Sequence, residues 1–153
     1  MPELLGLIRA QYALDSDGIH GVSHWKRVLD NGLRLCGTTG ADPKVVALFA
    51  FLHDSKRTNE GRDPDHGMRA ASFAEELAGV AFELSVRDLE RLVHACRLHS
   101  DGLTLGDITV VTCWDADRLD LGRVGIKPCP DALCTDAARD PDIMDWAYRR
   151  SLG

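Results

Sequence analysis

Val45-Val46-Ala47-Leu48-Phe49-Ala50-Phe51-Leu52-His53-Asp54 is an unbroken apolar run that ends in a histidine and an aspartate. Asp42 is a typical helix-capping residue and Pro43 suits a first helical turn, so the run predicts a buried helix over 43–54. Stripping water from an ionised carboxylate is costly unless a counter-charge or a metal replaces the solvent. Asp54 must therefore be paired, protonated or bound to a metal, and the further His and Asp residues on both sides of it favour a metal.

Length and composition predict one domain over residues 1–153. The chain has 153 residues, 44% of them hydrophobic, which is enough to close a single core. No window approaches the apolar length of a membrane helix, and the first residues lack a basic segment followed by an apolar one. We therefore expect a cytoplasmic protein with no membrane partner. The formal charge of −6 argues against binding to a nucleic-acid polymer, so an anionic substrate must be held by a local cluster.

The cysteines indicate reduced thiols. Their number is odd and they lack Cys-x-x-Cys spacing, which argues against a disulfide framework and against a zinc knuckle. We expect them in the core. They are Cys36, Cys96, Cys113, Cys129 and Cys134.

The hydrophobic periodicity is helical nearly throughout, and the sequence contains no repeats. It predicts an all-α bundle of about six to seven helices. Gly37, Gly79 and the Asp101-Gly102 pair mark expected helix ends. The polar segment 55–64 predicts a loop directly after the His53-Asp54 pair, where substrate contacts are common. The expected helices cover 3–13, about 23–36, 43–54, 65–78, 85–99, 108–121 and 141–150.

Helical faces separate the histidines into buried and solvated positions. His66 shares a face with the apolar residues of 65–78, and His99 continues the apolar stripe of 85–99. His94 lies among charged residues and is predicted to be solvated. His24 and His20 are four residues apart and would align on one helix if that helix began early, which the sequence leaves open.

These positions together favour a metal. A lone histidine on an apolar face is usually a core residue bonded to a carbonyl, but several of them beside Asp54 would be costly without an ion. Adjacent helical residues point about 100° apart, so His53 and Asp54 can share a metal only at a helix end, with further ligands from other helices. Periodicity does not choose between Asp115 and Asp117 as the carboxylate from the 108–121 helix.

The ordered set His24, His53-Asp54 and Asp117 resembles the H…HD…D signature of the HD superfamily of metal-dependent phosphohydrolases, and among its members the small, single-domain bacterial type. The resemblance covers about 18–125 and implies an all-α HD domain with a central metal site. Residues 126–153 lie outside the resemblance and are expected to form a helical tail. The matching motifs are His24-Trp25-Lys26-Arg27-Val28, Phe51-Leu52-His53-Asp54 and Ala116-Asp117-Arg118-Leu119.

The resemblance implies a ligand set for a divalent transition metal. It selects Asp117 over Asp115, and leaves Asp115 and Asp120 as surface carboxylates or as acceptors that orient a ligating histidine. His66 and His99 are similar to the extra histidines of members that bind two ions, with Asp54 as the bridge. Mixed His and carboxylate ligation suits Mn, Fe, Co, Ni or Zn better than Mg. The implied ligands of the first ion are His24, His53, Asp54 and Asp117.

The implied reaction is hydrolysis of a small phosphate ester, a nucleotide or related metabolite, by attack of a metal-bound hydroxide, with Asp54 as the central catalytic carboxylate. Arginine grips phosphate through a bidentate fork. The segment Ser55-Lys56-Arg57-Thr58 lacks the acidic residue that the superfamily's deoxynucleotidases and guanosine-tetraphosphate hydrolases carry there, which moves those substrates from first place. The predicted phosphate contacts are Arg57, Lys56, Arg27 and His20.

Two other functions compete with hydrolysis. A few HD members with this longer ligand set activate O₂ at a di-iron centre, so an iron-dependent oxygenase is the second enzyme class. The third hypothesis is a non-catalytic module whose site senses a metal or a nucleotide. Nucleotide binding without phosphate release would favour that module.

Overall fold

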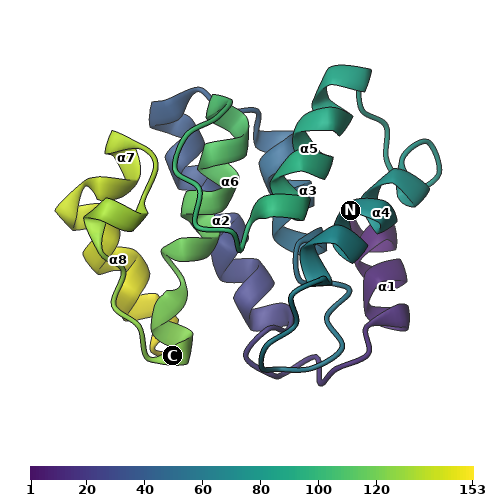
Figure 1. Cartoon of the computed structure of the whole chain (residues 1–153), viewed down its shortest axis with the longest axis horizontal. Helices are drawn as coiled ribbons and strands as arrows, with labels where there is room; N and C mark the ends of the chain where they lie inside the picture. The colour runs from purple at the N-terminus through teal and green to yellow at the C-terminus, as the bar shows by residue number, and fades with distance from the viewer.

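The chain folds into eight α-helices and two short 3₁₀ turns without a β-strand, in a computed structural model that describes all residues 1–153 (Figure 1). The all-α prediction is confirmed, with a helix count one above the expected range. In chain order the elements are α1 (Pro2–Gln11), α2 (Val22–Thr39), α3 (Pro43–Leu52), α4 (His66–Leu77), α5 (Val86–Leu98), α6 (Ile108–Arg118), η1 (Leu121–Val124), η2 (Pro130–Ala132), α7 (Asp136–Arg139) and α8 (Pro141–Ser151).

Helix α3 is the centre of the bundle. Its apolar side chains are almost all buried, and it contacts α2, α5 and α6 as well as α1 and α4. The Asp42 carboxylate accepts hydrogen bonds from the backbone amides of Lys44 and Val45, which satisfies donors that have no partner inside the helix. The helix ends at Leu52, so His53 and Asp54 lie in the turn that follows it.

Two predicted helix ends differ from the structure by three residues, and the other ends differ by two or fewer. Gly37 stays inside α2, which continues to Thr39 and ends at Gly40, whose φ of 75° is the left-handed conformation that favours glycine. The 108–121 helix stops at Arg118, and the chain then tightens into η1 before Gly125, whose φ is 81°. The end of α2 depends on which glycine adopts the positive φ, and the end of α6 depends on the tightening of the chain into η1. Periodicity indicates neither.

The tail over 126–153 packs against α2 and α6 and forms a second, smaller apolar cluster. The buried Asp115 carboxylate fastens it, because Asp115 accepts hydrogen bonds from the backbone amides of Cys134 and Thr135 and from the Thr135 hydroxyl. The two short elements η2 and α7 in this tail were not predicted. The cluster consists of Leu35, Leu119, Leu133, Ala138 and Ala147.

The cysteines are all free, as predicted, although they are not all in the core. Cys96 and Cys113 are buried, whereas Cys129 is exposed on the segment that leads into η2. None of the helices combines the length and the hydropathy that crossing a membrane requires.

Gly67 sets how closely α4 approaches α5. A Cβ at Gly67 would meet the carbonyl oxygens of Cys96 and Arg97 at 2.7 Å, so Gly67→Ala must push the two helices apart. Overpacking of this kind costs about 1–3 kcal/mol of unfolding free energy, which urea titration would measure. Gly37→Ala is the matched control, since its Cβ meets nothing within 4 Å, and it should stabilise α2 slightly. Equal stability of the two variants would contradict this packing.

Candidate metal centre

His53 and Asp54 enter the core from the turn after α3. Both side chains are at least 97% buried. The Nδ1 of His53 lies 3.0 Å from the carbonyl oxygen of Phe49 and 3.1 Å from that of Ala50, so the ring is held by the last turn of its own helix. Because the helix ends here, both side chains can point toward the same place although they are adjacent in the sequence.

A first cluster forms around the Nε2 atoms of His24 and His53, which are 3.0 Å apart. Oδ1 of Asp117 lies 3.3 Å from the first nitrogen and 3.5 Å from the second. Oδ2 of Asp54 lies at the same two distances, 3.3 and 3.5 Å. Asp115 points instead toward the tail, so the geometry separates the two carboxylates that periodicity could not.

A second cluster forms on the other side of Asp54. The Nε2 atoms of His66 and His99 are 2.8 Å apart, and Oδ1 of Asp54 lies 3.3 Å from one and 3.5 Å from the other. The two carboxylate oxygens of Asp54 therefore face different histidine pairs. This places His66 and His99 as their helical faces predicted.

The tautomers of these four histidines leave lone pairs facing each other. Nδ1 of His53, His66 and His99 lies against backbone carbonyl oxygens, and Nδ1 of His24 lies 2.7 Å from the Asp120 carboxylate. An acceptor on Nδ1 requires the proton there, so each neutral ring presents the bare Nε2 to its cluster. Two bare nitrogens at such distances repel each other, so each pair needs a proton or a metal ion between its members.

The Oδ1 atom of Asp117 is buried without a hydrogen-bond donor, which also favours a cation at this position. Buried carboxylate oxygens are rarely left without a partner. Two groups of three side chains each bring their ligand atoms within 4.8 Å of one another, as metal binding requires. They are His24, His53 and Asp117, and Asp54, His66 and His99.

The electrostatics of the site favour positive charge. Burial opposes a charged His24 ring, but the carboxylates of Asp117, Asp120 and Asp54 outweigh burial and raise the pKa of His24 to about 9. Burial would raise the pKa of Asp54, yet the surrounding histidines hold it well below its usual range, and the pKa of Asp117 is lowered in the same way. Both carboxylates are therefore ionised and ready to bind a cation.

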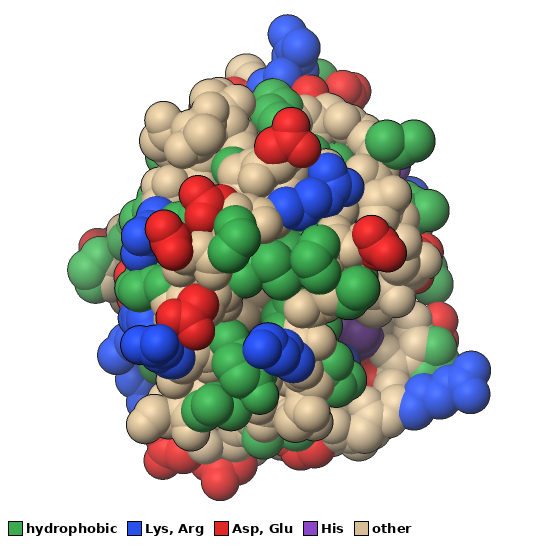
Figure 2. All heavy atoms as spheres, turned by 90° about the vertical axis from the view of Figure 1, so that its left-hand side faces the viewer, with side chains coloured by type: hydrophobic (Ala, Val, Ile, Leu, Met, Phe, Trp, Pro, Cys, Tyr) green, Lys and Arg blue, Asp and Glu red, His purple; other side chains and the backbone are tan.

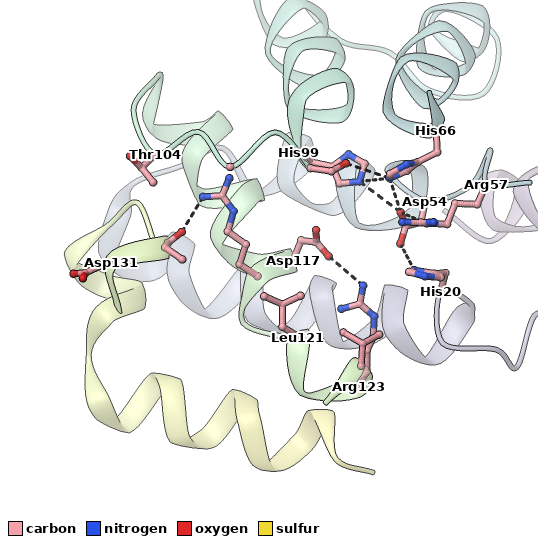
Figure 3. Close-up of a pocket in the computed structure, with 15 residues that line it drawn as sticks. His20, Asp54, Arg57, His66, His99, Thr104, Asp117, Leu121, Arg123 and Asp131 are labelled. Carbon is pink, nitrogen blue, oxygen red and sulfur yellow. Dashed lines mark hydrogen bonds and ion pairs between the residues drawn. The ribbon is translucent and has the colours of Figure 1, made fainter. Parts of the chain in front are cut away.

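A cavity of about 430 Å³ opens onto both clusters. Figure 3 shows His20, Asp54, Arg57 and His66 at one end, and Thr104 and Asp131 at the other. The space-filling view of the side that carries α7 and α8 shows a hollow with a histidine inside it (Figure 2). The size suits a small-molecule ligand.

Two of the four predicted phosphate contacts line this cavity. Arg57 does so, and its Nε donates to Oδ1 of Asp54 at 3.2 Å. His20 lines it too, with its Nδ1 3.1 Å from Oδ2 of Asp54. Helix α2 begins at Val22, so His20 lies in the turn before it. His20 and His24 therefore do not align on one helix.

The other two predicted contacts point elsewhere. The Lys56 ammonium lies over the ring of Phe73, 4.3 Å from its centroid, and does not line the cavity. Arg27 donates through Nε to Oδ1 of Asp120 at 2.7 Å, behind His24. The prediction that Lys56 and Arg27 contact the phosphate is corrected. Each side chain is held by a partner outside the cavity, Phe73 for Lys56 and Asp120 for Arg27. His94 is exposed, as predicted.

Two residues that line this region were not predicted as contacts, and the role of a third was left open by the sequence. Asp120 orients His24, one of the roles that the sequence left open for it. Arg118 and Arg123 line the cavity beside Asp117. Arg123 lies in the short 3₁₀ turn η1, where helical periodicity gives no signal. Arg118 was noted only as part of the motif that contains Asp117, so no separate role was predicted for it.

Asp120→Asn tests the support behind His24. The variant keeps the shape of the side chain but removes the charge that holds the imidazole, and losses of this kind typically weaken metal binding about 10- to 100-fold. Competition with a metal-sensitive dye would measure the affinity. Asp30→Asn is the control, because Asp30 pairs with Arg150 on the surface. An unchanged affinity in the Asp120 variant would contradict the orienting role.

The comparisons with known proteins rest on structure. No protein-family model matches the sequence, and neither does any curated protein. The structure is similar to a crystal structure of a predicted HD superfamily hydrolase from an uncultured Thermotogales bacterium. The likeness has a TM-score of 0.74 at 25% identity and covers 97% of this chain and 85% of that one. The chain therefore has the fold of an HD superfamily protein, in agreement with the resemblance in its sequence.

Proposed function

We propose that this protein is a metal-dependent phosphohydrolase that acts on a small phosphate ester, a nucleotide or related metabolite. The observation that carries the proposal is the pair of histidine clusters that share the two oxygens of Asp54 at the base of one cavity. The similar Thermotogales structure, described as a predicted hydrolase, supports the reaction class.

The proposed ligands of a first ion are His24, His53, Asp54 and Asp117, and those of a second are Asp54, His66 and His99. The facing Nε2 atoms and the unpartnered Oδ1 of Asp117 fit a cation. The donor set suits Mn, Fe, Co, Ni or Zn better than Mg. When bound, such an ion lowers the pKa of a bound water and polarises a phosphoryl oxygen.

Arg57 and Arg123 are the proposed phosphate contacts. Each uses Nε and Nη1 for hydrogen bonds within the protein. Nη2 of Arg123 lies 3.9 Å from Oδ1 of Asp117, and Nη2 of Arg57 donates to no protein acceptor. A guanidinium held in this way is oriented before the substrate binds, which lowers the entropic cost of gripping a phosphate.

The proposed reaction exchanges one oxygen on phosphorus. The oxygen of a water bonds to phosphorus, the ester P–O bond breaks, and a proton from the water ends on the leaving alcohol. The positive side chains of Arg57 and Arg123 would stabilise charge on the phosphoryl oxygens. His20 and Asp54 lie at the same wall of the cavity and would keep the reacting group in place.

We further propose that residues 1–153 act as one domain in the cytoplasm. The tail supports the single domain, since Asp131 and Ala132 line the same cavity as the motif residues. Free thiols at all five cysteines are typical of a reducing compartment.

A panel of phosphate esters tests the function. The metal-free protein, loaded separately with Mn, Fe, Co, Ni or Zn, should release phosphate from at least one nucleotide or sugar phosphate with more than one turnover per chain. Oxygen uptake is followed in the same samples. Substrate-dependent O₂ uptake with iron alone and no phosphate release would favour the oxygenase instead, and nucleotide binding without any turnover would favour a sensing module.

A further inference from the structure

Arg118 is buried, with 8% of its surface exposed, and it differs in its partners from Arg57 and Arg123, whose side chains are buried to a similar extent. It lies on α6 directly after Asp117 and lines the same cavity. Nothing in the proposed chemistry at the metal centre uses it. A buried guanidinium is costly unless its charge and its donors are matched, so its surroundings define what it needs.

No carboxylate pairs with Arg118, although its guanidinium carbon lies over the ring of Trp114, 5.7 Å from the ring centroid. Its Nη1 donates to the carbonyl oxygen of Ala132 at 3.0 Å and lies 3.3 Å from the Cys134 sulfur, and both acceptors are uncharged. Its Nη2 is buried without a hydrogen-bond partner. By contrast, Arg57 and Arg123 each have an aspartate within 4.0 Å.

Arg118 is held at the end of the cavity opposite Arg57 and His20. Its bond to Ala132 ties it to the end of the cavity where Figure 3 shows Thr104 and Asp131, whereas Arg57 and His20 lie at the opposite end. Asp131 is exposed, and its carboxylate points away from the cavity in that view. The cavity therefore has cationic groups at both ends, with about 430 Å³ of space between and around them.

We propose that the substrate carries a second anionic group on its leaving group, a carboxylate or a second phosphate, and that Arg118 selects for it. This inference rests on the proposed function. With the phosphate ester at Arg57 and Arg123, the far anion supplies the counter-charge and the acceptor that Arg118 lacks. The tail contributes to specificity because its segment around Ala132 holds the guanidinium in place.

The test compares pairs of phosphate monoesters in the metal-loaded protein. Carboxyalkyl phosphates of increasing chain length are matched with alkyl phosphates of the same length, and alkane bisphosphates form a third series. The wild type should favour one anionic series over the alkyl series by about 10- to 100-fold in kcat/KM, as expected for a charge-assisted hydrogen bond. Which anionic series is favoured distinguishes carboxylate from phosphate.

Arg118→Met should reduce this preference to less than about threefold, and Arg118→Lys should retain an intermediate preference, since lysine keeps the charge without the fork. Thr135→Val is the control. It removes the hydroxyl bond that fastens the same tail to Asp115 but leaves Arg118 unchanged, so the preference should persist. An undiminished preference in the Met variant, or none in the wild type, overturns the inference.

Calorimetry with the matching phosphonates, which are not hydrolysed, separates this inference from the proposed function. Tighter binding of a carboxyalkyl phosphonate or a bisphosphonate that depends on Arg118 would support the second anion site even if no ester were hydrolysed. Hydrolysis of all series at equal rates would leave the phosphohydrolase standing and reject the role of Arg118.

Discussion

Asp54→Ala should abolish metal binding at both clusters and with it any phosphate release. One oxygen of Asp54 faces His24 and His53 and the other faces His66 and His99, so a single substitution removes a ligand from each group. The helices should remain, because Asp54 follows α3 and does not belong to its apolar face. Elemental analysis of the purified variant and its far-ultraviolet circular dichroism measure the two effects.

His94→Ala is the matched control for that substitution. It also removes a titratable side chain, but His94 is exposed on α5 and lies near Trp114 and away from both clusters. Full metal content is expected in the control. Full metal content in the Asp54 variant would reject the site, and an equal loss of metal in both variants would show that the loss is unspecific.

The His66→Ala, His99→Ala double variant should lower the metal content from about two ions per chain to about one. These side chains form the second cluster with Asp54 and contribute nothing to the first, whose ligand atoms come from α2, α6 and the end of α3. Phosphate release should fall by at least tenfold if both ions act on the same phosphoryl group, as in two-metal sites. Elemental analysis and initial rates give both values.

The opposite pattern would contradict the two-cluster arrangement. A variant that loses all metal would mean that His66 and His99 hold the main site. A variant that keeps two ions and full activity would mean that His66 and His99 are only core histidines, bonded to the carbonyls of Asp63 and Cys96.

The parts of the fold that were predictable depend on local chemistry. The apolar run of α3 with Asp42 and Pro43 in front of it specifies a buried helix, and its end necessarily projects His53 and Asp54 together. The inward direction of His66 and His99 followed from helical periodicity in the same way. These features involve neighbours within a few turns of the chain.

The parts that were not predictable depend on partners far apart in the sequence. Lys56 lies over Phe73, and Arg27 pairs with Asp120, 93 residues away. Both were predicted to contact the phosphate, and neither reaches the cavity. Likewise, the position of Arg118 depends on the tail at Ala132, whose fold is irregular at that point. Lys56 and Arg27 were predicted as phosphate contacts, and only the tertiary packing shows which cationic side chains reach the cavity.

The most direct test of the account is phosphate release by the same sample before chelation, after chelation and after metal is restored. Release should disappear on chelation, return with one or more of Mn, Fe, Co, Ni or Zn, and stay absent in Asp54→Ala under every condition. Release that survives complete metal removal, or that persists in the Asp54 variant, would contradict the claim that this cluster of histidines and aspartates drives phosphate ester hydrolysis.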